Sequence, residues 1–132
     1  MKAIYKIFII SICTALCDIP YLYYNGGKFK NMISMIQNKE FNLRLIYLPP
    51  IYIMIGTLIY MGLFYDNNKY SNMEFIVRAF LIGMCTYGIY DFTNYATISG
   101  WDFNFMFMDM LWGGLLFTIV SLISKQIFKK II

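Results

Sequence analysis

The sequence predicts an all-α integral membrane protein, a bundle of four transmembrane helices. Of its 132 residues, 60% are hydrophobic and only 14% are charged, whereas an average soluble domain is about 45–50% apolar and about 25% charged. The apolar residues gather in four runs of about 20 residues, each long enough to cross a hydrocarbon core of about 30 Å as a helix. A backbone in lipid must satisfy its own hydrogen bonds, which a helix does.

The four predicted spans form a single domain, residues 1–132, and cover residues 4–24, 45–65, 74–95 and 102–124. The first span resembles a signal peptide, but Asp18 and Pro20 interrupt it and no small-x-small cleavage site follows, so we expect a retained helix. In the second span, Pro49 and Pro50 should either bend the helix or delay its start.

The first connector is the longest. Asn25-Gly26-Gly27 is expected to end the first helix. Apolar residues then recur at the spacing i, i+3, i+4, i+7, at Phe29, Met32, Ile33 and Ile36. This spacing predicts a short amphipathic helix lying in the membrane interface between helices one and two, with a plain loop as the alternative.

The other two connectors are short. Asp66-Asn67-Asn68-Lys69 is typical of a polar turn, and Ser99-Gly100 should break the chain before the fourth span. Trp101 is then placed to anchor the chain at the interface. With these spans, seven Lys and Arg residues flank the side of the termini and four flank the other side. Lys and Arg residues that flank membrane spans are enriched on the cytoplasmic side, so both termini are predicted to be cytoplasmic.

The composition excludes several classes of function. The absence of His removes histidine metal sites and Ser-His-Asp catalysis. The chain has only three cysteines, Cys13, Cys17 and Cys85, and the first two lie within an apolar run. They are too few for a metal centre without histidine, so neither a metal nor a cofactor is predicted. The net charge is +4, and the basic residues lie at the edges of the apolar runs. The sequence has no nucleic-acid-binding motif, so the expected partner is a lipid bilayer and not a nucleic acid.

Three carboxylates inside the predicted spans are the most informative residues. Asp18, Asp91 and Asp109 would each cost about 2.5–3.5 kcal/mol at a helix centre. Their positions place all three about 6–10 Å from the midplane, in the leaflet away from the termini. No Lys or Arg lies mid-span, although Arg44 could reach toward them. Such a cluster requires a shared proton, a bound cation or a water-filled cavity.

Small and polar residues at helical spacing accompany these carboxylates, and such stripes generally face neighbouring helices. The candidate ligand- or ion-binding residues are therefore Asp18, Tyr87, Asp91, Asn94, Asp109 and Trp112. The alternative is that the same residues only form hydrogen bonds that hold the bundle together, each contributing about 0.6–2 kcal/mol.

The stretch Tyr90-Asp91-Phe92-Thr93-Asn94-Tyr95-Ala96-Thr97-Ile98-Ser99-Gly100-Trp101, followed after seven residues by Asp109-Met110-Leu111-Trp112-Gly113, resembles the DUF2177 family of small membrane proteins. Asp18 is similar to that family's first-helix Asp, although Pro20-Tyr21-Leu22 stands where a Trp-Leu pair is usual. The resemblance implies four transmembrane helices and no particular activity. The matching motif positions are Asp91, Thr93, Asn94, Thr97, Gly100, Trp101, Asp109, Trp112 and Gly113.

Three functions follow from these patterns. The first is a protein that binds or conducts a proton, a cation or a small polar ligand, and a chain this small would need a homo-oligomer for transport. The second is a structural or accessory membrane protein without a ligand. The third, and least favoured, is an enzyme that uses Asp91 and Asp109 as a general acid/base pair.

Overall fold

The computed structural model describes residues 1–67 and 69–131 and confirms the four predicted helices. They are α1 (Ala3–Gln37), α2 (Leu48–Leu63), α3 (Asn72–Thr97) and α4 (Phe103–Ile131), with short 3-10 turns at Leu45–Tyr47 and Tyr65–Asn67. All four are long and apolar enough to cross a membrane. The protein is therefore an integral, multi-pass membrane protein that lies in a lipid bilayer.

Helix α1 differs from the prediction. The expected end at Asn25-Gly26-Gly27 is wrong, because α1 continues without a break to Gln37. Both glycines lie in open space, so neither faces a steric demand for a turn. The face formed by Phe29, Met32, Ile33 and Ile36 is helical as the spacing predicted, but it packs against Trp101 and Phe105. It is thus the distal part of α1 and not a separate interfacial helix.

The remaining helix ends follow local sequence signals. Pro49 and Pro50 lie in the first turn of α2, where their missing N–H groups cost nothing, so they start the helix. Ser71 and Glu74 form a capping box at the start of α3. Of the predicted polar turn before it, Asn68 lies outside the described residues. Gly100, with φ of 91°, makes the turn between α3 and α4 in a conformation that favours glycine.

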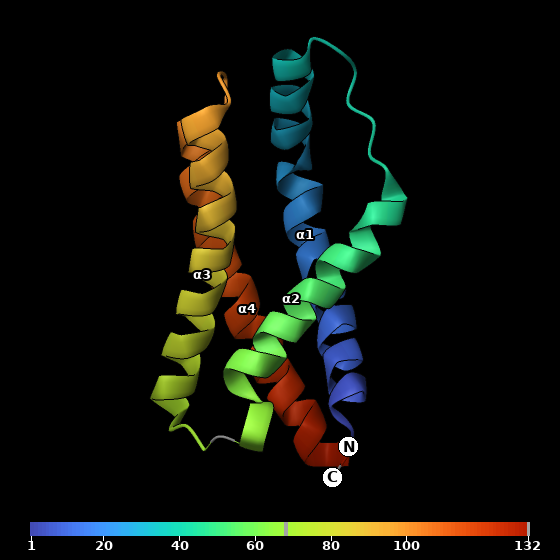
Figure 1. The fold of residues 1–132 in the computed structure, drawn as a ribbon, viewed down its shortest axis with the longest axis vertical. Helices are drawn as coiled ribbons and strands as arrows, with labels where there is room; N and C mark the ends of the chain where they lie inside the picture. Colours follow the sequence, from blue (N-terminus) through green and yellow to red (C-terminus); the bar gives the residue numbers. More distant parts are fainter. Residues whose placement is uncertain (68, 132) are drawn as a thin grey trace.

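The helices pack as two pairs (Figure 1). Helix α3 lies along α4, α1 crosses α2, and α1 also packs on α4, whereas α1 and α3 have little direct contact. Both termini lie at one end of the bundle. At the opposite end α1, α3 and α4 extend past the start of α2. Side chains of the distal part of α1 pack there against Trp101 and Phe105.

Close approach between α3 and α4 depends on glycine. A Cβ added at Gly83 would collide with the carbonyl oxygen of Gly113 and lie 2.7 Å from Phe117, and a Cβ at Gly113 would collide with Tyr87. Gly56 of α2 is similarly tight against Ser11 of α1. Small residues at helix crossings are the usual way for membrane helices to gain packing, because lipid supplies little hydrophobic driving force.

Two apolar clusters fill the interior. The larger one joins all four helices around Ile10, Ile59, Phe117 and Val120. The smaller one contains Trp101, which is 5% exposed. The indole of Trp101 therefore packs against the distal part of α1 and does not face the lipid. Its predicted role as an interfacial anchor stays a prediction. Many other large apolar side chains are exposed on the outer faces, as a lipid-facing surface requires.

We predict that Gly83→Ala destabilises the protein by about 1–3 kcal/mol, because the added methyl group overpacks the α3–α4 contact. The matched control is Gly27→Ala, which meets no atom within 4 Å and should keep or slightly raise stability in a helix. Thermal unfolding in detergent measures both. Equal melting temperatures for the two variants would contradict the close contact.

Candidate functional site

Asp18 links three helices through hydrogen bonds. Its carboxylate is 6% exposed and accepts one bond from the Tyr52 hydroxyl of α2 and one from the Trp112 indole N–H of α4, both at 2.8 Å. Each oxygen of Asp18 therefore has a donor from a different helix. In a low-dielectric interior such charge-assisted bonds are stronger than in water.

Asp109 is joined to the same network. It is 8% exposed and accepts a hydrogen bond of 2.8 Å from the Tyr21 hydroxyl of α1. The Tyr21 ring stacks on Trp112, with ring centroids 4.8 Å apart and planes at 5°. The stacked pair thus holds two donors at a fixed separation, one for Asp18 and one for Asp109.

Asp91 has a different environment. It is fully buried and lies beside the carboxyl group of Asp109 and the indole of Trp101. Neither Asp91 oxygen has a hydrogen-bond partner among the described residues, and the Trp101 indole nitrogen is likewise unpaired there. Buried polar groups are almost always hydrogen-bonded, and a buried carboxylate without a donor is especially costly.

A small cavity lies next to these groups, between α1, α3 and α4. It has a volume of about 180 Å³. We call it the carboxylate pocket because Asp18 and Asp109 both line it, together with Tyr21, Tyr87 and Phe105. Asp91 does not line this pocket, but its neighbour Asp109 does.

In the part of the chain that the structure describes, no Lys or Arg side chain lies beside these carboxylates. The charged neighbours of Asp18 and Asp91 are other carboxylates. Arg44, predicted to reach toward them, instead lies over the Tyr47 ring at 5.5 Å from its centroid. Within residues 1–67 and 69–131, no three His, Cys, Asp or Glu side chains are grouped as metal ligands. The site thus groups carboxyl groups without a compensating cation among the described residues.

Three of the six residues proposed from the sequence line this pocket, namely Asp18, Tyr87 and Asp109. Trp112 adjoins it through its hydrogen bond to Asp18, and Asp91 through its neighbour Asp109. Asn94 does not join them, because it is half-buried one turn beyond Asp91 and lines none of the cavities described here. Sequence reasoning missed Tyr21, Tyr52 and the inward position of Trp101. Tyr21 has a signal, since it follows Asp18 by three residues on the same helical face. Tyr52 has none, because its role depends on how α2 crosses α1.

Comparison with known proteins agrees with the fold. The family described as "Predicted membrane protein (DUF2177)" matches residues 3–125, nearly the whole chain. No curated protein and no solved structure matches the sequence. The family is named for membrane proteins without an assigned activity, so function must be argued from the geometry of the site.

We predict that Tyr52→Phe destabilises the protein by about 1–3 kcal/mol, because it removes one of the two donors of the buried Asp18 carboxylate. Tyr47→Phe, at an exposed tyrosine, is the control. In an Asp18→Asn background the cost should shrink, since no charge is then stranded. Chemical unfolding in detergent measures the wild type, Tyr52→Phe, Asp18→Asn and the double variant. If Tyr52→Phe destabilises the Asp18→Asn protein as much as the wild type, the hydrogen bond between Tyr52 and Asp18 is contradicted.

Proposed function

The chain belongs to the DUF2177 family of predicted membrane proteins, and we propose that it binds a proton or a small cation at the Asp91–Asp109 pair inside the bilayer. The observation that carries the proposal is Asp91, fully buried beside a second carboxyl group and without a hydrogen-bond donor.

Two adjacent carboxylates in an apolar interior repel each other and rarely stay ionised together. A proton held between Asp91 and Asp109 would supply the missing donor as an O–H···O bond and remove one charge. A small cation would serve the same purpose by contacting both groups. Either occupant would lower the free-energy cost of burying Asp91, because neither of its oxygens accepts a hydrogen bond from the described residues.

The carboxylate pocket gives the pair a route outward. Asp109 lines it and also adjoins Asp91, so an occupant that enters the pocket meets Asp109 first. Its volume of about 180 Å³ is below the range of about 300–1,000 Å³ typical of small-molecule sites. The size therefore favours a proton or a cation over the larger substrate that a carboxylate-dyad enzyme would take.

For Asp18, the hydrogen bonds favour the alternative role of holding the helices together rather than binding a ligand. Both of its oxygens already have donors, from Tyr52 and Trp112. We therefore assign Asp18 to holding α1, α2 and α4 together, and Asp91 and Asp109 to binding. The three carboxylates, which the sequence presented as one set, would then divide between two roles.

For topology we propose that both termini, which share one end of the bundle, lie in the cytoplasm. The carboxylate pocket would then lie in the outer half of the bilayer. Protease added outside intact cells should then digest a tag at either terminus only after the membrane has been permeabilised. A homo-oligomer remains a prediction for conduction, and chemical cross-linking in native membranes tests it.

We predict that the purified protein shows the infrared band of a protonated carboxylic acid at neutral pH, and that Asp91→Asn and Asp109→Asn each remove it. An Asn amide at either position can donate to the remaining carboxylate, so both variants should fold. The control is Asp66→Asn, an exposed carboxylate at a positive φ that Asn also tolerates. Sodium titration distinguishes the two occupants, because a bound cation would displace the band.

Proton flux into liposomes driven by a potassium diffusion potential then separates conduction from binding. Flux that disappears in Asp91→Asn and Asp109→Asn but persists in Asp66→Asn would extend the proposal to conduction. The proposal is wrong if the wild-type protein shows neither a protonated band nor a sodium-dependent change, or if both Asn variants retain the wild-type signals.

A further inference from the structure

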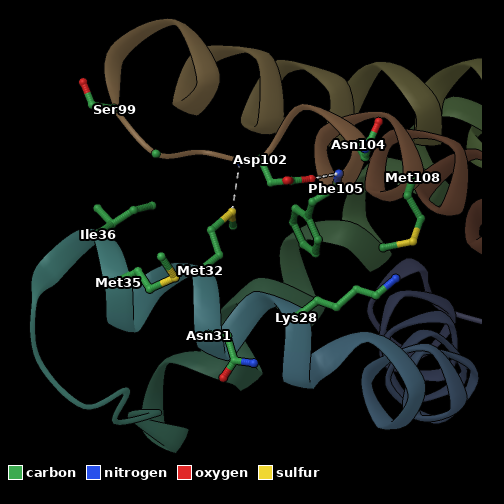
Figure 2. A pocket seen from close by; sticks show the side chains of 11 residues that line it. Lys28, Asn31, Met32, Met35, Ile36, Ser99, Asp102, Asn104, Phe105 and Met108 are labelled. Carbon is green, nitrogen blue, oxygen red and sulfur yellow. Dashed lines mark hydrogen bonds between the residues drawn. The ribbon is translucent and has the colours of Figure 1, made fainter.

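A second and larger cavity lies at the end of the bundle opposite the termini, between the last turns of α1 and the start of α4. We call it the end cavity (Figure 2). Its volume of about 880 Å³ lies within the range of sites that bind small organic molecules. Phe105 lines both the end cavity and the carboxylate pocket, but none of the three intramembrane carboxylates lines the end cavity.

The exposed side of α1 shows where this cavity lies in the membrane. From Ile4 on, the exposed side chains are apolar or aromatic up to Tyr23 and Tyr24, which are 82% and 79% exposed. Lys28 and Lys30 follow as exposed residues. Tyrosine followed by lysine is the usual order at the edge of a hydrocarbon core. The 35 residues of α1 also reach about 52 Å, well beyond a core of about 30 Å. Lys28 and the deeper side of the cavity therefore lie at the level of the lipid headgroups, and the last turns of α1 extend beyond it.

The lining of the end cavity is amphiphilic. Methionines provide much of its apolar wall, at Met32, Met35 and Met108. Met35, at the outer end of the cavity, is 82% exposed, whereas Met108 lies deeper, on α4. Methionine side chains are flexible and adapt to irregular apolar ligands.

The charged lining consists of one cation and one anion. Lys28 lies on α1 with its ammonium group on the side of Met108, and Asp102 lies across the cavity at the start of α4 (Figure 2). Asp102 is held in place because its Oδ1 accepts a hydrogen bond of 2.6 Å from the Phe105 backbone N–H. A ligand that matches this lining carries one negative and one positive group next to an apolar part.

We infer that the end cavity binds the headgroup end of a zwitterionic phospholipid. The phosphate lies toward Lys28, the amine lies toward Asp102 at the outer end of the cavity, and the glycerol and first acyl carbons lie deeper, against Met108 and Phe105. Lysine is a common phosphate-binding residue, and the acidic partner disfavours a headgroup with net negative charge. This site is independent of the proposed function, since its charged residues are not those of the Asp91–Asp109 pair.

The test is native mass spectrometry of the full-length protein from mixed micelles that contain equal amounts of phosphatidylethanolamine and phosphatidylglycerol. The wild-type protein should retain phosphatidylethanolamine preferentially. Lys28→Gln should weaken that retention about tenfold, because it removes a charge-assisted bond to phosphate. Lys30→Gln is the matched control, since Lys30 is an exposed lysine of the same helix outside the cavity lining.

Asp102→Asn provides a second, opposite readout. Asparagine keeps the helix cap but removes the negative charge, so the preference should shift toward phosphatidylglycerol. Glycerophosphoethanolamine, the same headgroup without acyl chains, is added as competitor and should not displace the lipid. Equal retention in Lys28→Gln and Lys30→Gln would indicate only a general lipid annulus and overturn the inference. Displacement by glycerophosphoethanolamine would also overturn it, in favour of a free phosphate compound.

Discussion

A carboxylate inside a bilayer needs donors that water cannot supply there, and the arrangement of α1, α2 and α4 depends on how that need is met for Asp18. Tyr52 and Trp112 each donate one hydrogen bond to it, so a single acidic side chain fixes the relative rotation of three helices. The same Trp112 stacks on Tyr21, which donates to Asp109. Moving any of these helices would strand a buried charge, and this penalty makes the packing specific.

The α3–α4 pair is held by a different constraint. Gly83 and Gly113 let the two backbones approach until a Cβ at either position would collide with its neighbour. This closeness brings Asp91 of α3 beside Asp109 of α4. Among the described residues, Asp91 is the one buried carboxylate whose oxygens accept no hydrogen bond. The feature that we propose as the binding site thus depends on the close packing of these two helices.

The two cavities in the half of the molecule away from the termini differ in size and in the chemistry of their linings. The carboxylate pocket is small and negative, whereas the end cavity is larger, amphiphilic and carries charges of both signs. Both exist because α1 leans on α4 but hardly on α3. Phe105 lines each of them, so its ring stands between the membrane surface and the carboxylates.

The sequence by itself determined the four helices, because apolar runs of about 20 residues and the hydrogen-bonding demand of lipid leave few alternatives. It also singled out Asp18, Asp91 and Asp109, since charge inside such runs is rare and costly. Only the tertiary structure decided that α1 continues through Gly26-Gly27, because contacts with Trp101 and Phe105, remote in sequence, stabilise its distal part. It likewise decided which carboxylate has donors. Tyr52 reaches Asp18 only through the crossing of α1 and α2, and no local periodicity encodes a contact between residues 34 positions apart.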